Sequence, residues 1–148
     1  MAARLAVVAL LAAAIAASPA ASMSLATTWL CFFDTGSAEL SPRCGTSVLG
    51  FADLWHRMRH GEVRGWPDEP PMVARTMGVE VQGHADAAEA AAGEASLGGA
   101  RAEPVAAFLR SNGVLADVIE VLAFGAERPL VPASGAEPQN RRVELHAR

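Results

Sequence analysis

Lysine and tyrosine are both missing from this chain of 148 residues, and only 5% of its residues are aromatic. Arginine supplies all 12 basic residues against 16 acidic ones, so the formal net charge is −4 at pH 7. Apart from the pair Arg141-Arg142 the arginines are scattered, which excludes the basic surface that nucleic-acid binding requires. Two cysteines are too few for a disulfide-dense scaffold. We therefore expect one compact domain with no nucleic-acid partner.

Apolar residues are concentrated at the start of the chain. Met1–Arg4 is a short basic start, residues 5–17 are uncharged and rich in Ala, Leu and Val, and Ser18–Ser22 offers small residues to a signal peptidase. The apolar part is shorter than the ~20 residues that a helix needs to cross a bilayer, which favours a cleaved signal over an uncleaved anchor. We predict a removed signal peptide over residues 1–22, a mature domain over residues 23–148 and a periplasmic location.

Export would place the two cysteines, Cys31 and Cys44, in an oxidising compartment. An oxidising compartment would let them close a small loop between a strand and the first turn of the next helix. Two half-buried free thiols are the alternative, and both remain open at this point. Two thiols alone fall short of a zinc site, so we expect no metal and no cofactor. Because Thr28-Trp29-Leu30 precedes Cys31 where a lipoprotein has small residues, we also expect no lipid anchor.

The apolar pattern predicts elements in the order strand, helix, strand, helix, strand, strand. The first helix has Ser41 as its N-cap before Pro42 and ends at Gly61, and the second ends at Asn112-Gly113. Residues 62–77 are rich in proline and glycine and predict a long connection. The expected strands cover residues 29–33, 79–82, 118–124 and 142–146. Right-handed crossovers would build an α+β fold, a mixed sheet of about four strands with helices on one face.

Several motifs agree in order and spacing with one known family. These motifs are Val79–Asp86, then Leu97, Arg101-Ala102, Val105 and Leu109, then Asn140–Leu145, with residues 31–42 as an opening strand and helix start. From about residue 29 to residue 148 the chain resembles the OmpA-like C-terminal domain, which holds peptidoglycan. The resemblance implies a non-enzymatic, non-covalent peptidoglycan-binding module that is associated with the outer membrane as a soluble cell-wall adaptor. Its partners would be peptidoglycan and other envelope proteins.

The resemblance also implies a ligand site. In the family, an Asp after the second strand and an Arg in the following helix grip the diaminopimelate side chain of the stem peptide. These roles fall on Asp86 and Arg101, and a further pocket position falls on Arg141. A zwitterionic head group needs an anion for its ammonium and a planar cationic fork for its carboxylate, which Asp and Arg supply. We expect Asp86→Ala and Arg101→Ala each to abolish retention on purified cell-wall sacculi and to leave the thermal midpoint nearly unchanged.

Four further residues are expected to surround the ligand without holding it. They are His84, Ala85, Glu94 and Asn140. Asn140 is expected to order a loop through its amide. The family usually has Thr at position 85, Gly at position 89 and Asn at position 94, so we expect weak affinity. Gly98 replaces the usual Ser, and Pro104 is expected to kink the second helix.

Other interpretations of the same charged residues remain open. Asp86 could cap the following helix, and Arg101 could pair with Glu94 or Glu103 on a solvated helix face. In that case the chain would keep an OmpA-like fold that has lost its ligand, and it would act as a protein–protein interaction domain.

Histidines suggest two weaker alternatives. His84 with Asp86 and Glu89 would be the candidates for a metal-dependent hydrolase. His56 and His60 are four residues apart on the first helix but have no evident third metal ligand. Neither arrangement is favoured over a structural role.

Overall fold

The computed structural model describes residues 28–60 and 78–147. The predicted signal peptide over residues 1–22, the helix end at Gly61 and the connection over residues 62–77 all lie outside these ranges. Within them, no helix combines the length and the apolar character needed to cross a membrane.

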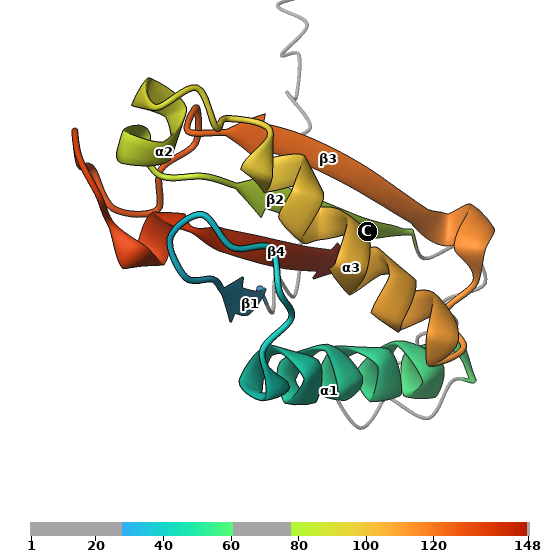
Figure 1. Cartoon of the computed structure of the whole chain (residues 1–148). Helices are drawn as coiled ribbons and strands as arrows, with labels where there is room; N and C mark the ends of the chain where they lie inside the picture. Colours follow the sequence, from blue (N-terminus) through green and yellow to red (C-terminus); the bar gives the residue numbers. More distant parts are fainter. Residues whose placement is uncertain (1–27, 61–77, 148) are drawn as a thin grey trace, which may run out of the picture.

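One mixed sheet of four strands organises the chain (Figure 1). The elements in chain order are β1 (Trp29–Phe32), α1 (Pro42–Arg59), β2 (Val79–His84), α2 (Ala87–Ala91), α3 (Leu97–Ser111), the 3-10 turn η1 (Ala116–Val118), β3 (Ile119–Gly125), the 3-10 turn η2 (Pro138–Asn140) and β4 (Arg142–Ala147). The strand order is β1-β4-β2-β3; β2 and β3 are parallel, and β4 is antiparallel to both β1 and β2. The α+β fold predicted from the sequence is confirmed, and the short helix α2 and the two 3-10 turns are additional.

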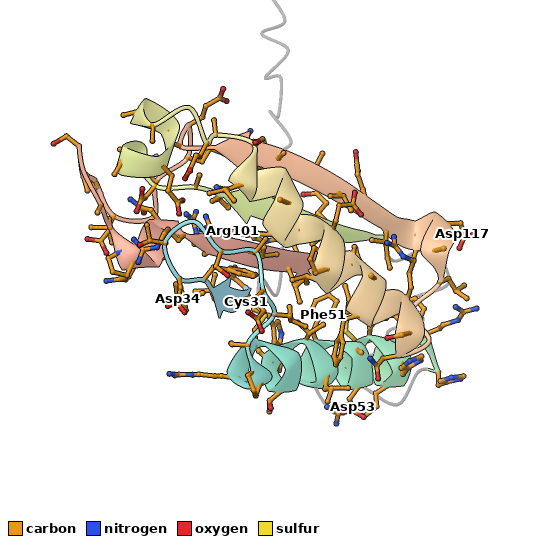
Figure 2. All side chains as sticks on the ribbon, in the orientation of Figure 1. Cys31, Asp34, Phe51, Asp53, Arg101 and Asp117 are labelled. Atoms are coloured by element: carbon orange, nitrogen blue, oxygen red, sulfur yellow. A yellow bond between two sulfur atoms is a disulfide. The ribbon has the colours of Figure 1, made fainter. Side chains whose placement is uncertain are left out.

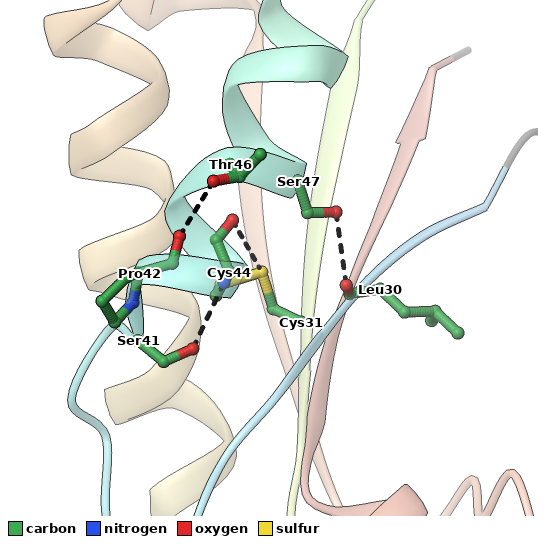
Figure 3. Close-up of a disulfide and its surroundings, with 7 residues drawn as sticks. All are labelled: Leu30, Cys31, Ser41, Pro42, Cys44, Thr46 and Ser47. Atoms are coloured by element: carbon green, nitrogen blue, oxygen red, sulfur yellow. Dashed lines mark hydrogen bonds between the residues drawn. A yellow bond between two sulfur atoms is a disulfide. The ribbon is translucent and has the colours of Figure 1, made fainter.

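The start of α1 follows the predicted capping pattern (Figure 3). The Ser41 side chain accepts a hydrogen bond of 3.2 Å from the backbone N–H of Cys44, and Pro42 opens the helix. A disulfide joins Cys44 to Cys31 of β1, with the two Cα atoms 4.9 Å apart. The structure therefore contains the bridge, not the two free thiols. It ties an edge strand to the helix that covers the sheet.

The core lies between the sheet and the two long helices, and Figure 2 shows Phe51 pointing into it from α1. Successive strand residues alternate between the faces of a sheet, so Val79 and Val81 face the helices while Glu80 and Gln82 face the other way. The fully or nearly fully buried apolar residues are Cys31, Phe33, Cys44, Val48, Phe51, Ala52, Trp55, Val79, Val81, Ala85, Ala102, Val105, Ala106, Leu109, Val114, Val143 and Leu145. This core fixes α3 across the sheet.

Two glycines let α3 approach β2 closely. A Cβ atom on Gly98 would lie 2.7 Å from the carbonyl oxygen of Gly83, closer than real Cβ contacts allow. The serine that the family usually has at position 98 would therefore not fit this backbone. The helix then continues through Pro104 to Ser111. This close approach sets Arg101, one turn into α3, over the carboxyl end of β2.

Candidate functional site

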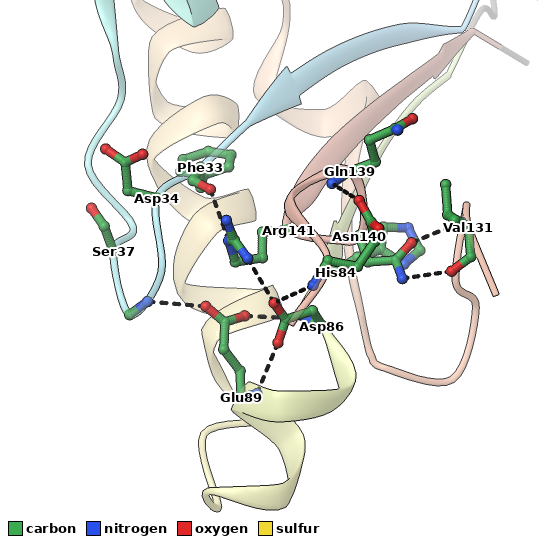
Figure 4. A network of polar contacts seen from close by, with 12 residues as sticks. Phe33, Asp34, Ser37, His84, Asp86, Glu89, Val131, Gln139, Asn140 and Arg141 are labelled. Carbon is green, nitrogen blue, oxygen red and sulfur yellow. Dashed lines mark hydrogen bonds and ion pairs between the residues drawn. The ribbon is translucent and has the colours of Figure 1, made fainter. Parts of the chain in front are cut away.

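Charged side chains from several segments meet where β2 ends (Figure 4). Asp86 and Glu89 come from the start of α2, Arg101 from α3, and Arg141 from the residue before β4. Residues 33–37, which follow β1, close the site with backbone groups. The structure thus brings together the three residues predicted to hold the ligand.

Arg101 is completely buried, with 0% of its surface exposed. Its Nε donates to the carbonyl of Ser37 at 2.8 Å. Its Nη1 donates to the carbonyl of His84 at 3.1 Å and to Oε2 of Glu89 at 2.8 Å. Its Nη2 donates to the carbonyl of Asp34 at 3.1 Å and to Oε1 of Glu89 at 2.7 Å. A guanidinium has five N–H donors, so all of those on Arg101 have partners within the chain.

Glu89 is the partner that neutralises Arg101. Its side chain is buried, and each carboxylate oxygen also accepts a backbone N–H, from Gly36 at 3.0 Å and from Asp86 at 3.2 Å. Burial by itself raises the pKa of Glu89, but the hydrogen bonds from Arg101 and the two backbone groups outweigh it and hold the pKa below its ordinary value. Glu89 is therefore ionised in the fold.

Asp86 is buried in the same way and has its own cation. Its Oδ1 accepts the backbone N–H of Glu89 at 2.8 Å, which caps α2. Its Oδ2 accepts from Nη1 of Arg141 at 2.8 Å and from the backbone N–H of Glu137 at 3.1 Å. Burial raises the pKa of Asp86, but these three donors together bring it below the ordinary value. Two ion pairs, Asp86 with Arg141 and Glu89 with Arg101, thus lie next to each other.

This network corrects two expectations. Arg101 pairs with Glu89 and with neither Glu94 nor Glu103, so the alternative of a solvated helix face is wrong. The expectation that Asp86→Ala and Arg101→Ala leave stability nearly unchanged is also overturned. Both side chains are buried, and removing either one leaves a charged partner unpaired inside the protein.

The open part of the site is a pocket beside Arg141. Its volume is about 240 Å³, and its lining is Phe32, Phe33, Asp34, Pro138, Gln139 and Arg141. The Nε of Arg141 donates to the carbonyl of Phe33 at 3.2 Å. The side chain of Arg141 is 9% exposed, against 0% for Arg101. The guanidinium that a ligand meets first in this arrangement is therefore Arg141.

His84 points away from this network, onto the sheet face opposite the helices. Its ring stacks on Phe124 with 5.5 Å between ring centroids, and its Nε2 lies 3.9 Å from Oε1 of Glu144. Neither ring nitrogen has a hydrogen-bond partner. Burial, assisted by the charge of Arg142, lowers the pKa of His84 to about 4.

The orientation of His84 and the ion pairs of the two carboxylates contradict the hydrolase alternative. Asp86 and Glu89 are each held by an arginine, whereas the His84 ring lies on the other face. No group of three His, Cys, Asp or Glu side chains in the described part of the chain could hold a metal ion. His56, offered with His60 as a metal pair, lies 2.9 Å from the carbonyl of Asn112 through its Nε2.

The low pKa of His84 predicts a pH-dependent stability. Between pH 6.5 and pH 4 the unfolded chain protonates this imidazole and the folded chain does not, so stability decreases by up to about 3 kcal/mol as the pH falls. His84→Phe keeps the stacking on Phe124 and removes the titration. Urea unfolding of the wild type and of His84→Phe across this pH range measures how the stability of each depends on pH. Equal slopes of stability against pH in the two proteins would contradict the assignment.

The remaining predicted residues have structural contacts. The backbone N–H of Ala85 donates to the carbonyl of Gly125 at 2.9 Å. The buried side-chain amide of Asn140 accepts from the backbone N–H groups of Leu130 and Val131 and donates to the carbonyl of Val131, which fixes the loop before η2. Glu94 is exposed.

The sequence interpretation missed the central role of Glu89 and the place of Asp34 in the pocket lining. A signal for Glu89 was present, because Asp86 and Glu89 have the three-residue spacing of a capping box. That pattern predicts the reciprocal backbone hydrogen bonds. It does not predict that the Glu89 carboxylate also reaches Arg101.

Comparison with known proteins gives one family and one fold. Residues 32–142 match the OmpA family. An outer membrane protein of Gluconacetobacter diazotrophicus is 31% identical over 128 residues, which covers 81% of this chain and 30% of that protein. The chain therefore spans under a third of the length of that curated relative.

Solved structures share the fold at low identity. The peptidoglycan-associated lipoprotein from Burkholderia pseudomallei has a TM-score of 0.61 and 22% identity, covering 80% of this chain and 89% of that one. The OmpA-like domain of FopA1 from Francisella tularensis has a TM-score of 0.61 and 20% identity, and the match covers 80% of this chain and 69% of that one. The C-terminal domain of Helicobacter pylori MotB has a TM-score of 0.58 and 17% identity, and the match covers 79% of this chain and 81% of that one.

Proposed function

The chain belongs to the OmpA family, and on that premise we propose that it is a non-enzymatic module that binds peptidoglycan non-covalently in the bacterial cell envelope. The names of its relatives support this proposal, since one is a peptidoglycan-associated lipoprotein and another an outer membrane protein. We further propose that a signal peptide over residues 1–22 exports the chain to the periplasm, where it serves as a wall adaptor.

The proposed ligand is the diaminopimelate side chain of the stem peptide. The observation that carries this proposal is the convergence of Asp86, Arg101 and Arg141 at one end of the sheet, beside an open pocket. The ligand carboxylate would first meet the fork of Arg141, and the exposed carboxylate of Asp34 offers a partner for its ammonium. Asp86 and Arg101 each contact a residue of the pocket lining, since Asp86 accepts from Arg141 and Arg101 donates to the carbonyl of Asp34.

The second candidate is a protein–protein interaction domain that has kept the fold and lost the ligand. One observation favours it: every N–H donor of Arg101 already has a partner in the chain. A binding experiment with the cell wall separates the two functions.

We expect the chain to sediment with purified sacculi at low salt. Arg141→Met and Asp34→Asn are each expected to weaken this retention about tenfold or more, because each removes one charge-assisted contact to the zwitterion. Asp34→Asn changes an exposed side chain, so a folding defect does not complicate its result. Arg57→Met on α1 is the matched control, since it removes an exposed positive charge away from the site.

Two outcomes would contradict the proposal. A wild-type chain that stays in the supernatant would leave the interaction domain as the better function. New cleavage products in the muropeptides of the same sacculi, with or without added zinc, would contradict the non-enzymatic assignment.

A further inference from the structure

Four N–H donors from three segments surround the Glu89 carboxylate. Arg101 supplies two of them at 2.7 and 2.8 Å, and the backbones of Gly36 and Asp86 supply one each at 3.0 and 3.2 Å. We call these four donors the carboxylate cradle. Such a fork together with two backbone N–H groups is suited to any planar carboxylate.

The guanidinium of the cradle is held independently of Glu89. Three backbone carbonyls, those of Asp34, Ser37 and His84, accept the other donors of Arg101. The ring of Phe33 lies 5.5 Å from Cζ of Arg101 and stacks against the cation. These contacts fix the position of the fork, so it would stay in place with two free donors if the Glu89 carboxylate left.

Glu89 is carried by an element that contributes no side chain to the apolar core. Helix α2 has five residues, and Glu89 is its only buried one. Withdrawing the side chain therefore requires no rearrangement of the apolar core, which is formed by α1, α3 and the sheet.

We infer that the carboxylate cradle is a binding site for carboxylate ligands that the chain fills with its own Glu89, and that a carboxylate of the wall peptide reaches Arg101 by displacing Glu89. The identity of that ligand rests on the proposed function; the cradle itself does not. An internal carboxylate competes at a high effective concentration, so it weakens the binding of any external one.

Acetate is the probe for the cradle. In Glu89→Ala the four donors of the carboxylate cradle lose their partner. We expect acetate to bind in the position of the missing carboxylate and to raise the thermal midpoint of this variant by about 2–4 °C relative to chloride at equal ionic strength. Neither the wild type nor Glu103→Ala is expected to respond, although the latter removes a carboxylate from the exposed face of α3. If Glu89→Ala is unfolded in chloride, acetate is expected to restore its folding.

The result that overturns the inference is a Glu89→Ala protein whose stability or folding is the same in acetate and in chloride. The wall is tested separately, because Glu89→Ala is expected to bind free meso-diaminopimelate about tenfold more tightly than the wild type. Acetate rescue without any binding of diaminopimelate or sacculi would support the cradle and contradict the proposed function. Equal affinity of both proteins for diaminopimelate would contradict the displacement of Glu89.

Discussion

Replacing Arg101 by methionine is expected to lower the free energy of unfolding by about 3–5 kcal/mol, the range for breaking a buried ion pair by removing one partner. Methionine fills much of the same volume but provides no donors. The variant leaves the buried carboxylate of Glu89 without its cation and three backbone carbonyls without their N–H partners. Urea unfolding of the variant and the wild type at pH 7 measures the difference.

Two further variants show whether the loss comes from the ion pair. Combining Arg101→Met with Glu89→Gln removes the unpaired charge and keeps an oxygen acceptor, so we expect it to recover at least about 1 kcal/mol. Arg110→Met removes a partly exposed arginine of the same helix and is expected to change stability by no more than about 0.5 kcal/mol. A loss in Arg101→Met as small as that in Arg110→Met would contradict the buried pair.

Loss of the disulfide is the second change for which we expect a large effect on the free energy of unfolding. Cys31 and Cys44 are separated by 13 residues, and opening a loop of this size is expected to cost about 3 kcal/mol of stability. The bridge connects β1 to α1, so its removal lets these two segments move independently in the unfolded ensemble. Urea unfolding of the wild type with and without a reductant measures this effect.

The double variant Cys31→Ala/Cys44→Ala serves as the control. It is expected to have a similarly low stability and to be insensitive to the reductant. An unchanged urea midpoint of the wild type after full reduction, verified by thiol labelling, would contradict a stabilising bridge.

The fold was predictable because its signals are local. Ser41-Pro42 marks the start of α1, Asn112-Gly113 marks the end of α3, and alternating Val residues mark β2. Each signal depends on a few neighbouring residues. The short helix α2 has no apolar period, since its one buried residue is a glutamate, and apolar patterning therefore missed it.

The candidate site was predictable only in part. Motif spacing selected Asp86, Arg101 and Arg141, which the fold does bring together. The choice of ion-pair partner depends on tertiary geometry, and Glu89 reaches Arg101 because α2 turns back toward α3. The direction of His84 was available from the sequence, because a residue three positions after the inward-facing Val81 lies on the opposite face of a strand.

The central claim is that the end of β2 binds the diaminopimelate of the cell wall, and a titration followed by backbone amide NMR tests it most directly. The ligands are two muropeptides that differ in one residue, meso-diaminopimelate or lysine, of which only the first has a second carboxylate. We predict saturable shifts of the amides of Phe33, Asp34 and Arg141 with the diaminopimelate peptide and weaker or no shifts with the lysine peptide. Identical responses to both peptides, or none at these residues, would contradict the account.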